Sequence, residues 1–90
     1  MYWIYILENI SDISWYIGYT SDLKKRIAEH QKGDGARTTK RKIGWKLIYC
    51  EGYLNQADAK GRERFLKSGS GRRIFKKQIN HYLNPEKQVR

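Results

Sequence analysis

The chain has 90 residues, enough for one domain and too few for two, and a chain this short buries only about 60% of its unfolded surface. Nineteen Lys and Arg against nine Asp and Glu give a net charge of +10, which favours a polyanion such as nucleic acid as partner over a merely solvated basic surface. The single Cys50 excludes an internal disulfide and a cysteine-rich zinc site. No apolar run approaches the roughly 20 residues of a membrane span, so we expect a cytoplasmic protein without membrane attachment.

The first predicted elements are a β-hairpin and a helix. Residues 2–7 and 15–19 are rich in aromatic and β-branched side chains and are separated by polar turn residues, which is typical of two paired strands. The segment 20–22 offers N-cap side chains, and Gly33 suits a helix C-terminus. These signals predict a helix over residues 21–32.

The second half begins with a polar, basic loop over residues 34–44 and continues with a strand over 45–53. Asn55 is expected to cap a helix that runs to residue 67, and the Ser-Gly-Ser-Gly segment 68–71 is expected to break it. Apolar residues at helical spacing then predict a third helix over 72–83.

The order β-β-α-β-α-α indicates an α+β fold in which a three-stranded antiparallel sheet is flanked by helices. We expect residues 1–83 to form a single domain and residues 84–90 to form a polar C-terminal tail. Composition and periodicity therefore predict a small basic domain that binds nucleic acid, and they go no further.

Two strand motifs frame the hairpin: residues 3–5 read Trp-Ile-Tyr and residues 16–18 read Tyr-Ile-Gly, with ten residues between them. The next helix carries Arg26 and His30, four residues apart, and the predicted second helix carries Glu63. In this order, and on these predicted elements, the motifs resemble the GIY-YIG nuclease superfamily, which includes DNA repair nucleases. The resemblance covers roughly residues 2–67.

The resemblance implies a Mg²⁺- or Mn²⁺-dependent endonuclease that hydrolyses phosphodiester bonds one strand at a time, with 5′-phosphate and 3′-hydroxyl products. It places Tyr5 and His30 beside the attacking water and gives Tyr16 the orientation of phosphate or water. Arg26 would stabilise developing negative charge, and Glu63 would hold the metal ion. DNA is the expected substrate ahead of RNA.

Two departures from the family pattern are visible. Trp3 replaces the first glycine, while Tyr5, to which the chemistry is assigned, is kept. Many members also carry an Asn beyond the Glu, and here Gln78, Asn80 and Asn84 are the available amides; none receives that role. Taken singly, the tyrosines could be half-buried strand aromatics, the arginine and histidine surface cations, and the glutamate an ion-pair partner. Only their joint pattern favours a catalytic site.

Two clusters of basic residues are candidates for contacts with backbone phosphates: Arg37, Lys40, Arg41 and Lys42 in the loop, and Arg72, Arg73, Lys76 and Lys77 on the last helix. A solvated charge cluster is the alternative for each. The rival functions are a nucleic-acid-binding module of the same fold without useful activity, and a catalytic subunit that needs a protein partner for targeting. Sequence specificity and oligomeric state are not encoded in any motif.

Overall fold

A computed structural model describes residues 1–33 and 43–87. Its elements, in chain order, are β1 (Tyr2–Asn9), β2 (Trp15–Thr20), α1 (Leu23–Gln31), β3 (Trp45–Tyr53), α3 (Gln56–Lys67), α4 (Gly69–Gln78), α5 (Asn80–Leu83) and the 3₁₀ helix η1 (Pro85–Lys87). The predicted α+β class and element order are confirmed. The division into a domain and a tail stays a prediction, and η1 lies within the proposed tail.

The sheet is antiparallel, with the strand order β2-β1-β3. The central strand β1 places Tyr5 opposite Gly18 of β2 and opposite Cys50 of β3. Because β1 has a neighbour on each side and helices over both faces, all of its residues from Ile4 to Asn9 are buried. Strand β2 forms one edge of the sheet, an arrangement that matters for the site.

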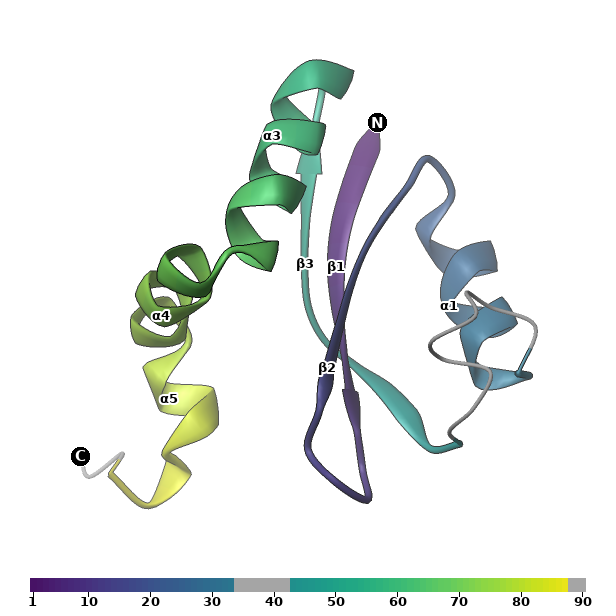
Figure 1. Ribbon diagram of the computed structural model, residues 1–90. Coiled ribbons are helices and arrows are strands. Elements are labelled where there is room, and N and C mark those ends of the chain that lie inside the picture. The colour runs from purple at the N-terminus through teal and green to yellow at the C-terminus, as the bar shows by residue number, and fades with distance from the viewer. Residues whose placement is uncertain (34–42, 88–90) are drawn as a thin grey trace.

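The molecule has three layers (Figure 1), with α1 on one face of the sheet and α3, α4 and α5 on the other. The core is accordingly split in two. On the α3–α4 face, Ile4 and Ile6 pack with Leu66 and Phe75. On the α1 face, Tyr5, Leu7 and Trp45 are the buried residues, and further side chains including Tyr16, Leu23 and Ile27 pack around them. Alternate residues of β1 therefore belong to different cores.

Side-chain caps fix the helix ends. Asp22 accepts a hydrogen bond from the Lys25 backbone N–H at the start of α1, and Asn55 accepts one from Asp58 at the start of α3, as predicted for Asn55. Ser68 ends α3 and caps α4 by accepting from the Gly71 backbone N–H at 3.0 Å. The helices are thus joined through a single residue.

The structure corrects two predicted boundaries. The segment 68–71 was expected to be a break, but only Ser68 is outside a helix, since α4 already begins at Gly69. The third helix, expected to be continuous over 72–83, is interrupted at Ile79, whose φ of −107° and ψ of 32° are not helical. In the described part of the chain, no helix is long and apolar enough to cross a membrane.

Candidate active site

The first component of the site is the glycine of the Tyr-Ile-Gly motif, which makes room for a tyrosine. Tyr5 and Gly18 face each other across β1 and β2. A Cβ atom at Gly18 would lie 2.3 Å from both Cζ and the hydroxyl oxygen of Tyr5, far inside van der Waals contact. Any side chain at this position would therefore displace the phenol ring.

Helix α1 brings its two predicted residues to the same face of the sheet. The Tyr5 hydroxyl lies 2.8 Å from Nε2 of His30, and the Tyr16 ring centroid lies 5.0 Å from the His30 ring and 6.2 Å from the Tyr5 ring. Arg26 is one helical turn before His30 and is close enough to Tyr5 to lower the tyrosine pKa. The four side chains that the sequence singled out in the first 30 residues thus gather on one face of the sheet.

Tyr5 is kept protonated by its surroundings. Burial raises its pKa to about 12, and Tyr16 and, to the smallest extent, Glu63 act in the same direction, whereas Arg26 opposes them. The phenol therefore keeps a proton that it can donate to Nε2 of His30.

His30 is held neutral. Burial and the nearby Arg26 charge lower its pKa, and Glu29 only partly offsets them. A neutral imidazole keeps one acceptor nitrogen, which matches the bond from Tyr5. Tyr5 and His30 are 0% and 1% exposed. Their expected place beside an attacking water stays a prediction, and such complete burial favours a positioning role.

Tyr16 and Arg26 are the partly exposed members of the group. Within residues 1–33 and 43–87, the Tyr16 hydroxyl has no hydrogen-bond partner, so it is available to a substrate. Arg26 forms an ion pair with Glu29 at 2.9 Å, and this hydrogen bond raises the Arg26 pKa. The guanidinium therefore stays charged and is oriented from its own helix.

Glu63 comes from the opposite layer. Its helix, α3, packs on the face of the sheet that α1 does not cover, and contacts β1 and β2 (Figure 1). Its carboxylate makes the smallest of the contributions that raise the Tyr5 pKa, while burial makes the largest. Because β2 is an edge strand, the open edge of β2 is where a group from one face can meet a group from the other.

The residues present fit a metal ion of the magnesium type. The Glu63 side chain is 20% exposed and pairs with Lys67 at 2.9 Å, while the Lys67 side chain is 55% exposed. The described residues contain no group of three or more His, Cys, Asp or Glu that could hold a metal. A single carboxylate suits Mg²⁺, which keeps several waters and binds substrate phosphate oxygens.

The basic residues predicted to contact phosphates divide into three sets. Those of the loop, Arg37, Lys40, Arg41 and Lys42, lie outside the described residues. On α4, Arg72 and Lys76 lie over the ring of Trp15, at 5.7 and 5.6 Å from its centroid. Arg73 and Lys77 are exposed, each one position further along the helix. The structure thus separates two pairs that the sequence had grouped together.

The amides considered in place of the family Asn have hydrogen-bond partners away from the site tyrosines Tyr5 and Tyr16. Gln78 accepts from Arg62 at 3.1 Å and donates to the Tyr49 hydroxyl at 3.0 Å. Asn84 donates to the side chain of Asn80 at 2.9 Å. Sequence reasoning also missed Glu29, although its position three residues after an arginine on a helix is the usual spacing of an ion pair.

A family model described as the GIY-YIG catalytic domain matches residues 1–80. The chain therefore belongs to the GIY-YIG nuclease family, whose members act on nucleic acid.

Its relatives are UPF0213 proteins. The chain is 42% identical to one from Streptococcus pneumoniae over 65 residues, which are 72% of this chain and 65% of that protein. It is 38% identical to the UPF0213 protein YsiG of Lactococcus lactis over 88 residues, covering 98% of this chain and 84% of the relative. A UPF0213 protein from Bacillus halodurans, solved by NMR, has the same fold with a TM-score of 0.52 and 32% identity, over 83% of this chain and 82% of that one.

Proposed function

We propose that this protein is a divalent-metal-dependent endonuclease that hydrolyses phosphodiester bonds in DNA, one strand at a time. The observation that carries the proposal is the gathering of Tyr5, Tyr16, Arg26 and His30 on one face of the sheet, while α3, which carries Glu63, contacts β1 and β2 from the other face. Phosphodiester hydrolysis requires an oriented water, neutralisation of charge on phosphorus and support for the leaving oxygen. The gathered groups can provide the protein's share of each.

The partly exposed side chains make the proposed contacts with substrate. Arg26 is a permanently charged donor and binds a nonbridging phosphate oxygen, where it stabilises the charge that builds up during attack. The Tyr16 hydroxyl, which is unpaired within the described residues, orients the phosphate or the attacking water. A divalent ion held by Glu63 would lower the pKa of a bound water and neutralise charge on the leaving oxygen.

The buried pair positions these groups. Tyr5 hydrogen-bonds His30, and Glu29 holds the Arg26 guanidinium from the same helix. The Tyr16 ring packs against both Tyr5 and His30. Such a packed second layer restricts both exposed side chains to few rotamers, which is a condition for efficient catalysis.

The second candidate function is a nucleic-acid-binding module, or a catalytic subunit that acts only with a targeting partner. The ion pair between Glu63 and Lys67 favours it, because the carboxylate must leave this partner before it can bind a metal. The two functions make the same prediction for binding and opposite predictions for cleavage.

The test is cleavage of supercoiled plasmid, single-stranded DNA, branched DNA and RNA by the purified protein, with Mg²⁺, Mn²⁺ or EDTA. We expect nicking that requires metal and falls at least 100-fold in Glu63→Gln. Glu86→Gln, which removes an exposed carboxylate from η1, is the matched control and should cut like the wild type. Cleavage that persists in EDTA or in Glu63→Gln would remove the metal role. Binding without cleavage on any substrate would establish the second candidate.

A further inference from the structure

A hollow of about 310 Å³ lies on the face of the sheet opposite to Tyr5, next to the β1–β2 hairpin. Its lining comes from β1, the hairpin, α4 and α5: Glu8, Ile13, Ser14, Trp15, Arg72, Lys76 and Leu83. This size is at the lower end of the range for small-ligand sites. The lining combines an aromatic ring, two cations and a buried carboxylate, a composition that neither the family's motifs nor the proposed mechanism requires.

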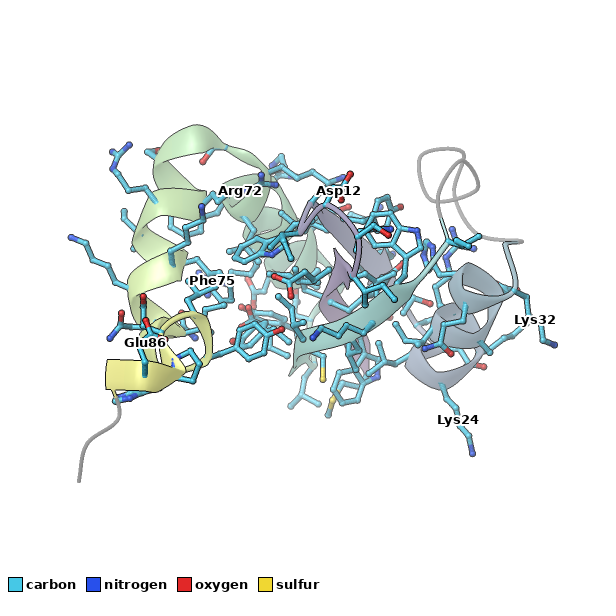
Figure 2. All side chains as sticks on the ribbon, turned by 90° about the horizontal axis from the view of Figure 1, so that it is seen from below. Asp12, Lys24, Lys32, Arg72, Phe75 and Glu86 are labelled. Carbon is cyan, nitrogen blue, oxygen red and sulfur yellow. The ribbon has the colours of Figure 1, made fainter. Side chains whose placement is uncertain are left out.

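The two cations are pre-positioned on the aromatic ring. The Arg72 guanidinium carbon lies 5.7 Å and the Lys76 Nζ 5.6 Å from the centroid of Trp15. Figure 2 shows Arg72 and Phe75 on the side of α4 that faces the sheet, whereas Lys24 and Lys32 project from α1 into solvent. No carboxylate of the described chain lies within ion-pair distance of Arg72 or Lys76. Two adjacent cations that have no ion-pair partner within residues 1–33 and 43–87 indicate a site for an anion.

The buried carboxylate fixes the ring. Glu8 is 6% exposed, accepts from the indole Nε1 of Trp15 at 3.0 Å and from the Tyr82 hydroxyl at 2.8 Å, and has Lys46 Nζ at 4.0 Å. The two neutral donors stabilise the buried carboxylate, and Lys46 offsets part of its charge, so the hollow, which also has Arg72 and Lys76 in its lining, keeps a net positive charge. Its part in the hollow is to orient Trp15, which in turn orients Arg72 and Lys76.

The hollow adjoins the candidate active site through the edge strand. Trp15 and Tyr16 are consecutive residues of β2, and consecutive strand residues point to opposite faces. A strand of nucleic acid that crosses the free edge of β2 can therefore meet Tyr16 on one face and Trp15 on the other. Ile13, at the rim, has a φ of 63°, a strained value for a β-branched residue, and strain of this kind concentrates at ligand sites.

We propose that this hollow binds a phosphodiester group of the nucleic-acid strand other than the one that is cut. Arg72 and Lys76 contact this phosphodiester group. The hollow thereby sets the path of the strand over the β2 edge. The proposal rests on the proposed function only in that the chain must bind nucleic acid. It does not require cleavage, so the two can fail separately.

The test is equilibrium binding of a fluorescent single-stranded 16-mer in EDTA, measured by anisotropy from 50 to 300 mM NaCl. Removing two phosphate contacts should reduce the slope of log K against log [salt] by about 1.4 in Arg72→Gln/Lys76→Gln. The matched control, Lys24→Gln/Lys32→Gln, removes the same charge from two exposed side chains on the α1 side of the sheet, away from the hollow, and should keep the wild-type slope. Both pairs are on the surface, and thermal unfolding of each variant verifies the fold.

Equal slope changes in the two double variants would overturn the proposal, since they would reflect only net charge. Absence of binding by the wild type would overturn it too. A further arm replaces chloride by inorganic phosphate at matched ionic strength. If inorganic phosphate weakens oligonucleotide binding no more in the wild type than in Arg72→Gln/Lys76→Gln, the oligonucleotide does not occupy the hollow and the strand-path proposal is wrong. Wild-type binding without cleavage, together with the expected slopes, would retain the hollow and reject the nuclease.

Discussion

Tyr5 and Tyr16 each differ from phenylalanine by one hydroxyl group. The surroundings of this hydroxyl group differ between the two residues. In Tyr5→Phe, the buried Nε2 of His30 loses its 2.8 Å partner, so we expect the free energy of unfolding to fall by about 1–3 kcal/mol. In Tyr16→Phe, no hydrogen bond to a described residue is lost, so stability should stay within about 0.5 kcal/mol. Urea denaturation measures both values.

Cleavage should show the reverse order. Tyr16→Phe removes the hydroxyl proposed to face the substrate and should lower the single-turnover rate by about 10²-fold or more, whereas Tyr5→Phe, measured well below its melting temperature, should lower it less. If Tyr5→Phe is the more damaging to turnover and leaves stability intact, then Tyr5 contacts the reacting water and the positioning role assigned to it is wrong.

The pH dependence of stability tests the environment of His30. Its pKa is lowered in the folded state by burial and by Arg26, so the unfolded chain binds a proton there more readily than the folded chain. The stability contributed by neutral His30 is therefore fully present above about pH 6.5 and is lost as pH falls through the folded pKa. We expect urea midpoints between pH 8 and 5 to fall less in His30→Gln than in the wild type.

How far individual residues could be predicted depended on where their partners lie in the sequence. Arg26 and His30 are one helical turn apart, so their shared face follows from local geometry. The contact between Gly18 and Tyr5 depends on the strand register, and the sequence motif offered no measure of it. The same holds for Trp15, whose neighbours Arg72 and Lys76 are more than fifty residues away along the chain.

Among the elements, α3 and α4 contain glycines with opposite requirements. A Cβ at Gly61, in the middle of α3, would have only the end of the Arg64 side chain near it, at 3.8 Å. Alanine there should stabilise the protein by about 0.5–1 kcal/mol through helix propensity. A Cβ at Gly71 would lie 1.7 Å from the Phe65 carbonyl oxygen, so Gly71→Ala must separate the two helices and should cost about 1–3 kcal/mol or more.

Thermal and urea unfolding of the two alanine variants measure this difference. The far-ultraviolet circular dichroism spectrum should be unchanged in Gly61→Ala, which serves as the control for the general effect of adding a methyl group to a helical glycine. Stabilisation by both substitutions would show that the helices are not in close contact at Ser68 and would contradict the tight junction described above.

The element order was predictable because hydrophobic patterning and turn residues are local signals. The boundaries around Ser68 were not, since a Ser-Gly-Ser-Gly run is typical of a break. Tertiary contact reversed that preference: Ser68 caps the next helix, and Gly71 allows α4 to begin against the end of α3. At Ile79 the sequence has no Gly or Pro that would predict the interruption of the helix, and the apolar spacing continues across this position.

In the molecule as a whole, the net charge does not show where the candidate sites lie, because a site depends on the placement of individual side chains. The net charge of +10 is a property of the full sequence and indicates only the class of partner. Lys24 and Lys32 extend from α1 away from the sheet (Figure 2), while Arg72 and Lys76 are drawn onto an aromatic ring on the opposite side. Composition could not distinguish a diffuse positive field from a defined anion site, because that difference depends on which cations share a neighbour.

The position of Glu63 in a different layer from Tyr16 and Arg26 has a consequence for the order in which the protein acquires its abilities. The tyrosines, the arginine and the histidine all lie within the first 30 residues, whereas the carboxylate follows after β3. If the proposed metal site is correct, a nascent or partly unfolded chain has the groups that grip phosphate before it has the one that enables cutting. The protein would then be able to cut nucleic acid only after α3 has docked onto the sheet and the fold is complete.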